Sequence, residues 1–127
     1  MSGKRYYVDT NAIIQLLAGN RELLEKLNQA AYVATSVICE LEYFAFPNLA
    51  DEDKELFEQF RPQVDVTDLC SADTQLKEKI SELRSQKNLK LPDAIIAASA
   101  LQNDCILLTA DQNLLHHPGI KTENLTE

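Results

Sequence analysis

Short apolar runs typical of β-strands alternate along this chain with longer segments that have helical spacing. The strand-like runs are residues 5–8, 31–35, 64–66, 105–108 and 120–122. The helical segments between them are 12–17, 21–29, 36–46, 51–60, 72–86 and 92–102, and a short helix is expected after residue 111. Strands separated by helices pair in parallel through right-handed crossovers. The order predicts a three-layer α/β/α fold with a central parallel sheet, in which the most apolar run, 105–108, lies centrally.

The size and composition of the chain fit one domain spanning residues 1–127. A chain of 127 residues and 14.3 kDa with 45% apolar residues can fold without a disulfide or a metal. Its apolar stretches are too short to span a bilayer, and no long apolar region follows the basic residues at the start. The three scattered cysteines, Cys39, Cys70 and Cys105, predict reduced core thiols and a cytoplasmic location.

The charge balance restricts how this chain could bind nucleic acid. Twelve basic and twenty acidic residues give a net charge of −8, which argues against coating nucleic acid through bulk positive charge. An enzyme that acts on nucleic acid at one site remains compatible with that balance. Five basic residues fall between positions 77 and 90, namely Lys77, Lys79, Arg84, Lys87 and Lys90. They form either a solvated helix face or a strip that binds phosphate groups.

Four acidic residues fall at one edge of the predicted sheet or at neighbouring helix ends. In an open parallel sheet, ligands bind where the carboxyl ends of the strands meet the following helices. The first strand-like run ends at Asp9, the run 105–108 is followed closely by Asp111, and Asp93 opens the helix before it. Glu40 lies one turn into the helix that follows the second run. The set is therefore Asp9, Glu40, Asp93 and Asp111.

Each acid taken alone also has a purely structural interpretation. Asp9 and Asp111 could cap the helices that follow them, and Asp93 could interact with the dipole of its own helix. Glu40 is harder to explain, because a capping box that starts at Ser36 would need its acid at position 39. If the four converge, their mutual repulsion requires a cation, and carboxylate oxygens are suited to Mg²⁺ or Mn²⁺. Such a site commonly serves phosphoryl chemistry.

Three segments carry a resemblance to a known family: YYVDTNAIIQLL, ATSVICELEY and LKLPDAIIAASALQNDCILLTAD. In content, order and spacing they resemble the blocks of the PIN-domain ribonucleases, especially the VapC-like toxins of type II toxin–antitoxin pairs. The resemblance runs over nearly the whole chain. It departs in one place, since many relatives carry a further acid or histidine and then phenylalanine three and four residues beyond the last acid. This chain has Leu114 and Leu115 there, so a fifth acidic group is not implied.

The resemblance implies an Mg²⁺- or Mn²⁺-dependent endoribonuclease. It implies that Asp9, Glu40, Asp93 and Asp111 are the catalytic and metal-binding residues, directly or through water. Supporting hydrogen bonds would come from Thr10, Asn11, Ser36 and Thr109, and the basic strip would contact RNA through Arg84, Lys87 and Lys90. The implied partners are an RNA substrate, a small antitoxin that inserts a basic side chain among the acids, and a second copy of the chain in a homodimer.

Two other functions are compatible with the same residues. The chain could be a PIN-fold module that binds RNA or protein with little or no catalysis. It could also be a PIN nuclease that processes RNA outside toxin–antitoxin systems. The four acids favour catalysis over binding alone, because loss of core acids would be expected in a binding module.

Overall fold

The computed structural model describes residues 3–115 and 117–125, apart from the side chain of Lys87. Five strands form one parallel sheet: β1 (Arg5–Val8), β2 (Tyr32–Ser36), β3 (Asp65–Thr67), β4 (Ile106–Leu108) and β5 (Thr122–Glu123). The helices are α1 (Thr10–Leu17), α2 (Arg21–Asn28), α3 (Val37–Phe44), α4 (Asp51–Phe60), α5 (Thr74–Lys87) and α6 (Leu91–Gln102). A 3-10 turn, η1 (Arg61–Gln63), joins α4 to β3. The predicted α/β/α architecture is confirmed.

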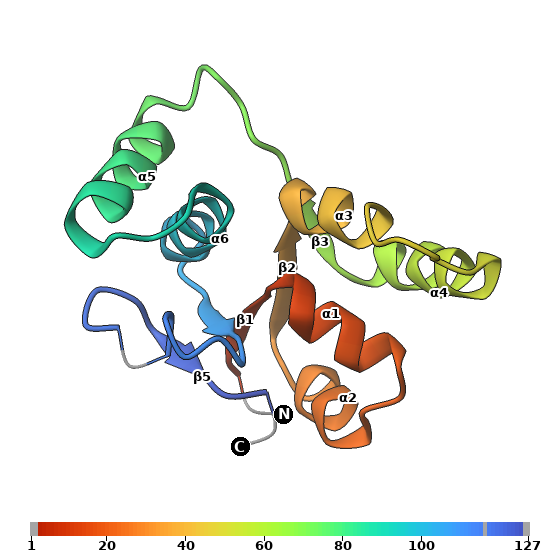
Figure 1. Ribbon diagram of the computed structural model, residues 1–127. Coiled ribbons are helices and arrows are strands. Elements are labelled where there is room, and N and C mark those ends of the chain that lie inside the picture. Colours follow the sequence, from red (N-terminus) through yellow and green to blue (C-terminus); the bar gives the residue numbers. More distant parts are fainter. Residues whose placement is uncertain (1–2, 116, 126–127) are drawn as a thin grey trace.

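The strand order β3-β2-β1-β4-β5 determines which face each helix covers. From β1 the chain proceeds outward to β2 and β3, and from β3 it crosses back to β4 on the other side of β1. Right-handed crossovers in opposite directions place their helices on opposite faces of the sheet. Figure 1 shows α1 to α4 on one side of the strands and α5 with α6 on the other.

The core is built on β1, which is the middle strand of the sheet. Three of its residues, Tyr6, Tyr7 and Val8, are buried, and β1 pairs with β2 on one side and β4 on the other. Helix α6 is apolar nearly all round, so it fits only where it is covered on both sides. It packs between the sheet and α5, and its residues from Ala94 to Ala100 are buried.

A cluster of aromatic rings joins α3 to α4. Phe57 is completely buried, and its ring centroid lies 4.9 Å from that of Tyr43, 5.1 Å from that of Phe44 and 5.7 Å from that of Phe60. The Tyr43 hydroxyl also donates a hydrogen bond to the carbonyl of Asp53, at 3.0 Å. The cluster holds α4 against α3, which is the helix that starts at the end of β2.

The last strand is held by one carboxylate. Glu123 accepts hydrogen bonds from the ammonium groups of Lys4 and Lys26, both at 3.0 Å, and from the Tyr6 hydroxyl at 3.1 Å. Lys26 also donates to the carbonyl of Asn124 at 3.2 Å. These bonds tie the two-residue strand β5 to β1 and α2, which compensates for its short backbone ladder.

Some expected features differ from the observed ones. Helix α1 begins at Thr10 rather than at residue 12, because Asp9 is its N-cap. The expected helix after residue 111 is a series of turns over 112–115. Strand β1 rather than β4 is central, although β4 lies beside it. Of the three cysteines, Cys39 and Cys105 are buried, whereas Cys70 is exposed.

Within the described residues, no helix combines the length and the apolar character that crossing a membrane would require.

The aromatic cluster predicts a sharp contrast between two neighbouring positions of α4. Phe57→Ala should lower the free energy of unfolding by about 3–5 kcal/mol, because it removes a ring that is fully enclosed by other side chains. Leu56→Ala should cost less than about 1 kcal/mol, since Leu56 is 36% exposed. Urea unfolding of both variants measures the difference. Equal losses would show that the cluster does not hold α4 in place.

Candidate metal centre

The strand order creates one position where two neighbouring strands lead in opposite directions. The chain leaves β1 toward β2, whereas it leaves β4 toward β5 on the other side. Between the carboxyl ends of such a pair, open α/β sheets form a crevice that binds ligands. Asp9 directly follows β1 and Asp111 lies three residues beyond β4. The topology therefore brings these two predicted acids to the same crevice.

Asp9 is the most buried acid of the site. Its side chain accepts a hydrogen bond from the backbone N–H of Ala12 at 2.8 Å and so caps α1, and the residue is only 7% exposed. Burial raises the pKa of Asp9, although hydrogen bonds from Thr109 and Ala12 work in the opposite direction. The charges of Asp111 and Asp93 also raise the pKa of Asp9. Asp9 can therefore cap α1 and also act as a metal ligand, because the cap bond from Ala12 uses only one of its carboxylate oxygens.

Asp93 and Asp111 approach the crevice from different elements. Asp93 lies in the first turn of α6, and its pKa is raised by burial and then by the charges of Asp111 and Glu42, while Lys90 lowers it. The turn that carries Asp111 is held by two hydrogen bonds. The backbone N–H of Asp111 donates to the Thr109 hydroxyl at 3.0 Å, and the Asp111 carboxylate accepts from the N–H of Asn113 at 2.9 Å.

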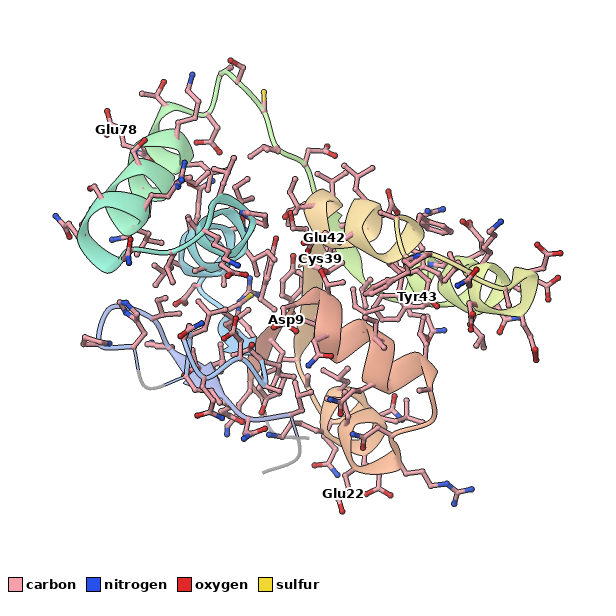
Figure 2. The ribbon with its side chains drawn as sticks, viewed as in Figure 1. Asp9, Glu22, Cys39, Glu42, Tyr43 and Glu78 are labelled. Atoms are coloured by element: carbon pink, nitrogen blue, oxygen red, sulfur yellow. The ribbon has the colours of Figure 1, made fainter. Side chains whose placement is uncertain are left out.

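The acids line a cleft of about 320 Å³ between the two groups of helices. Figure 2 shows Asp9 and Glu42 near the centre of the molecule, where α1 and α3 approach each other. No basic side chain is among the described residues that line this cleft. They are Asp9, Thr10, Asn11, Glu42, Asp93, Ile96, Ala110 and Asp111.

Glu40, the fourth predicted acid, does not join the others. Its carboxylate accepts a hydrogen bond from Nε of Arg61 at 2.7 Å, and Arg61 also binds Glu58 at 2.7 Å. Glu42 takes its place in the cleft, where it accepts a hydrogen bond from the Thr10 hydroxyl. Residues two apart on a helix point about 200° away from each other, so one helix cannot bring both acids to one cleft.

The sequence pattern alone could not show that Glu42, rather than Glu40, lines the cleft. Cys39 and Tyr43 mark the inward face of α3, and the two glutamates flank that face on opposite sides. Helical periodicity treats the two flanks alike. The side on which α1 and α6 lie decides between them, and this is a property of the tertiary structure. The hydrogen bond from the Thr10 hydroxyl to the Glu42 carboxylate identifies the side that faces the cleft, and no sequence pattern predicts it.

The predicted supporting residues have different positions. Thr10 and Asn11 line the cleft, and Thr109 is fully buried behind it. Ser36 is buried and caps α3 by accepting a hydrogen bond from the N–H of Ile38 at 3.1 Å, so it supports the helix rather than the cleft. Leu114 and Leu115, where the sequence departs from the resemblance described above, are both buried.

The predicted basic strip is only partly near the cleft. Lys90 is exposed, precedes α6 and is close enough to Asp93 to lower its pKa. Arg84 is exposed on α5. The side chain of Lys87 lies outside the described part of the structure. The prediction that these residues contact RNA therefore stays a prediction.

The donor chemistry of the cleft fits a hard divalent cation, although the acids are not gathered tightly. Carboxylate oxygens are suited to Mg²⁺ and Mn²⁺. Burial and, to a lesser extent, neighbouring carboxylates raise the pKa of Asp9 and that of Asp93. Among the described histidine, cysteine, aspartate and glutamate residues, no three already form a group that could hold a metal ion. The residues fit such an ion in kind, and side-chain rotation would have to bring them together.

Comparison with known proteins identifies the family. The model of the PIN domain matches residues 6–120, so this chain belongs to the PIN-domain family, as its motifs predicted. No match is found among curated proteins.

Among solved structures, one similar fold is a toxin–antitoxin complex from Klebsiella pneumoniae. It is 25% identical with a TM-score of 0.79, and the match covers 96% of this chain and 98% of that one. DNA-bound VapBC from Salmonella typhimurium is 20% identical with a TM-score of 0.78, over 96% and 98% of the two chains. VapBC-1 from nontypeable Haemophilus influenzae is 19% identical with a TM-score of 0.75, over 97% and 99%.

Burial of Asp9 predicts a pH-dependent gain of stability in Asp9→Asn. An asparagine keeps the capping acceptor for α1 but carries no charge. The pKa of Asp9 is higher in the folded than in the unfolded chain, so its contribution to stability falls as the pH rises between the two values. In EDTA at pH 7, Asp9→Asn should therefore be more stable than the wild type, and the difference should shrink as the pH falls through the folded pKa.

Urea unfolding at several pH values measures this effect, and Asp68→Asn serves as the control because Asp68 is exposed. An Asp9→Asn variant less stable than the wild type at pH 7 would contradict a destabilising buried charge at this position.

Proposed function

We propose that this protein is a metal-dependent endoribonuclease and the toxin of a type II toxin–antitoxin pair. The observation that carries the proposal is the cleft at the carboxyl ends of β1 and β4, which four carboxylates line and where no basic side chain is among the described lining residues. The similarity to a toxin–antitoxin complex over almost the whole of both chains supports the biological role. Membership of the PIN-domain family supports the nuclease chemistry.

Asp9, Glu42, Asp93 and Asp111 are the residues that would hold Mg²⁺ or Mn²⁺ in this cleft. When bound, such an ion activates water and offsets the charge that develops on the phosphodiester. The chain supplies the positioning. Thr10 holds the Glu42 carboxylate, and Thr109 holds the turn of Asp111 and the side chain of Asp9.

We assign Asp93 as the general base of the proposed reaction. Its pKa is raised by burial and by two neighbouring carboxylates, so a side-chain oxygen of Asp93 binds a proton more readily than an ordinary aspartate. It is also less enclosed than Asp9, so water reaches it more easily. In the proposed reaction this oxygen accepts the proton of the attacking water.

The choice between Glu40 and Glu42 gives a direct test of the site. Glu42→Gln should lower the rate of RNA cleavage by about 100-fold or more, because it removes a charged ligand from the cleft. Glu40→Gln should stay within a few-fold of the wild type, since Glu40 pairs with Arg61 away from the cleft. Cleavage of a total-RNA pool in Mn²⁺, in Mg²⁺ and in EDTA measures both, and Asp9→Asn controls for contaminating nuclease.

A second readout separates metal binding from catalysis. Mn²⁺ should raise the melting temperature of the wild type and of Glu40→Gln, and it should raise that of Glu42→Gln much less. If Glu40→Gln were the inactive variant, the fourth acid would be the one assigned from the sequence. If the protein bound RNA but did not cut it with either metal, the alternative of a PIN-fold binding module would replace the nuclease.

An apolar groove beside the acids supports the antitoxin partner. A cavity of about 200 Å³ is lined by Ile14, Leu17, Tyr43 and Phe46 among others, and Phe46 is 45% exposed. A neighbouring cleft of about 530 Å³ joins Phe46 to Thr10 and Glu42, and so connects this groove to the acids. The arrangement fits a partner segment that packs apolar side chains in the groove and places a basic side chain among the carboxylates.

Replacing Phe46 should weaken the antitoxin complex without affecting the free enzyme. Phe46→Ser removes an exposed apolar contact of the groove but leaves the acids intact. Co-expression with the product of the adjacent small open reading frame, followed by affinity purification, should give a complex without ribonuclease activity, and Phe46→Ser should release activity from it. If no adjacent product binds, an RNA-processing role outside toxin–antitoxin systems is favoured.

Light scattering on the purified protein tests the proposed homodimer.

A further inference from the structure

A second cleft adjoins the acids on the side opposite to the apolar groove. It has a volume of about 410 Å³, within the range of about 300–1,000 Å³ typical of small-molecule sites. Asp93 and Asp111 form a wall that this cleft shares with the acidic one. Its other lining residues come from the loop between α5 and α6 and from the turn after Asp111: Asn88, Leu89, Lys90 and Asn113.

The polar groups of this cleft are available to a ligand. In the described part of the chain, the side chains of Asn88, Lys90 and Asn113 form no hydrogen bond or ion pair with other residues. A side-chain amide offers both a donor and an acceptor, which is the combination that matches the edge of a nucleobase. Leu89 also lines the cleft, and the small part of it that is exposed is apolar.

The local backbone determines where the side chains of Asn88 and Asn113 leave the main chain. Asn88 ends α5 in the left-handed conformation, with φ of 57°, where asparagine is among the best-tolerated residues. The backbone N–H of Asn113 is held by the Asp111 carboxylate at 2.9 Å, so the turn that carries Asn113 is tied to the proposed metal site. The backbone at Asn88 and at Asn113 is therefore held beside the acids, and both side chains line the cleft.

We propose that the cleft lined by Asn88, Lys90 and Asn113 is a nucleobase subsite, and that it holds the base next to the phosphodiester over the acids. The proposal rests on the nuclease function proposed above and adds a determinant of its sequence preference. The amides of Asn88 and Asn113 bind the base edge, Leu89 contacts its face, and Lys90 binds the phosphate of the same nucleotide.

The distribution of charge supports this assignment of roles. Asp93 and Asp111 repel a phosphate, whereas Lys90 is the one cation among the described residues that line the cleft and attracts one. A nucleotide is therefore oriented with its phosphate toward Lys90 and its uncharged base toward the amides. A phosphodiester can approach the carboxylates only when a cation offsets their charge.

Binding of mononucleotides tests the subsite independently of cleavage. The probes are the four ribonucleoside 5′-monophosphates, added to ¹⁵N-labelled full-length protein in EDTA. We expect saturable shifts of the side-chain amide signals of Asn88 and Asn113, with one base preferred. Asn113→Ala, and Asn88→Gly, which keeps the left-handed backbone accessible, should each weaken binding of that base by about 2- to 10-fold.

The charge role has its own matched pair of variants. Lys90→Gln should weaken the binding of all four nucleotides to a similar extent, because a phosphate contact does not distinguish between bases. Lys54→Gln should leave nucleotide binding unchanged, since Lys54 lies on α4 and is not among the residues that line the cleft. In the cleavage assay, Asn113→Ala should alter the preferred base beside the cut while leaving metal dependence unchanged.

The outcomes separate this inference from the proposed function. Base-dependent binding at Asn88 and Asn113 without RNA cleavage in Mn²⁺ or Mg²⁺ would support the subsite and overturn the nuclease. Metal-dependent cleavage, together with amide signals that no nucleotide shifts, would overturn the subsite and leave the nuclease intact. Shifts of equal size with inorganic phosphate at the same concentration would also overturn it, because they would show a phosphate site without base recognition.

Discussion

The burial of the Asp9 carboxylate at the end of the central strand is the constraint on which the site depends. Strand β1 is covered on both faces, so the first residue after it enters the crevice while still largely enclosed. Asp9 uses this position to begin α1, which a neutral asparagine would also do. Burial and the nearby carboxylates disfavour the negative charge of Asp9, although the dipole of α1 and two hydrogen bonds favour it. On the function proposed above, a divalent cation in the cleft would offset this charge.

Thr109 links this constraint to the rest of the fold. Its backbone N–H donates a hydrogen bond to the carbonyl of Glu123 at 3.2 Å. Its hydroxyl accepts a hydrogen bond from the backbone N–H of Asp111 and is hydrogen-bonded to the side chain of Asp9. The short strand β5 thus determines where Thr109 lies, and Thr109 determines how two of the acids are arranged. The anchoring of Glu123 by Lys4, Lys26 and Tyr6 consequently matters at the cleft as well as at the sheet edge.

The sequence predicts much of this arrangement, because strand ends are visible in it. Asp9, Asp93 and Asp111 follow or open elements whose apolar pattern is clear, so their convergence follows from parallel topology alone. Glu42 could not be found in this way, since periodicity marks the buried face of α3 but does not distinguish its two flanks. The first turn of α1 is also hard to place from the sequence. Threonine and asparagine at positions 10 and 11 are themselves good caps, and only the hydrogen bond from the N–H of Ala12 identifies Asp9 as the cap.

The two flanks of the acidic cleft differ in a way that sequence patterns do not show. Toward α1 and α3 the neighbouring surface is apolar and includes the exposed ring of Phe46, whereas toward the α5–α6 loop it carries amides and a lysine. An apolar flank suits a folded protein segment, and a flank of amides with one cation suits a nucleotide. On the functions proposed above, inhibitor and RNA would meet at the carboxylates but use different flanks. Competition between them would then be decided at the acids, where a basic side chain and a metal ion neutralise the same charge.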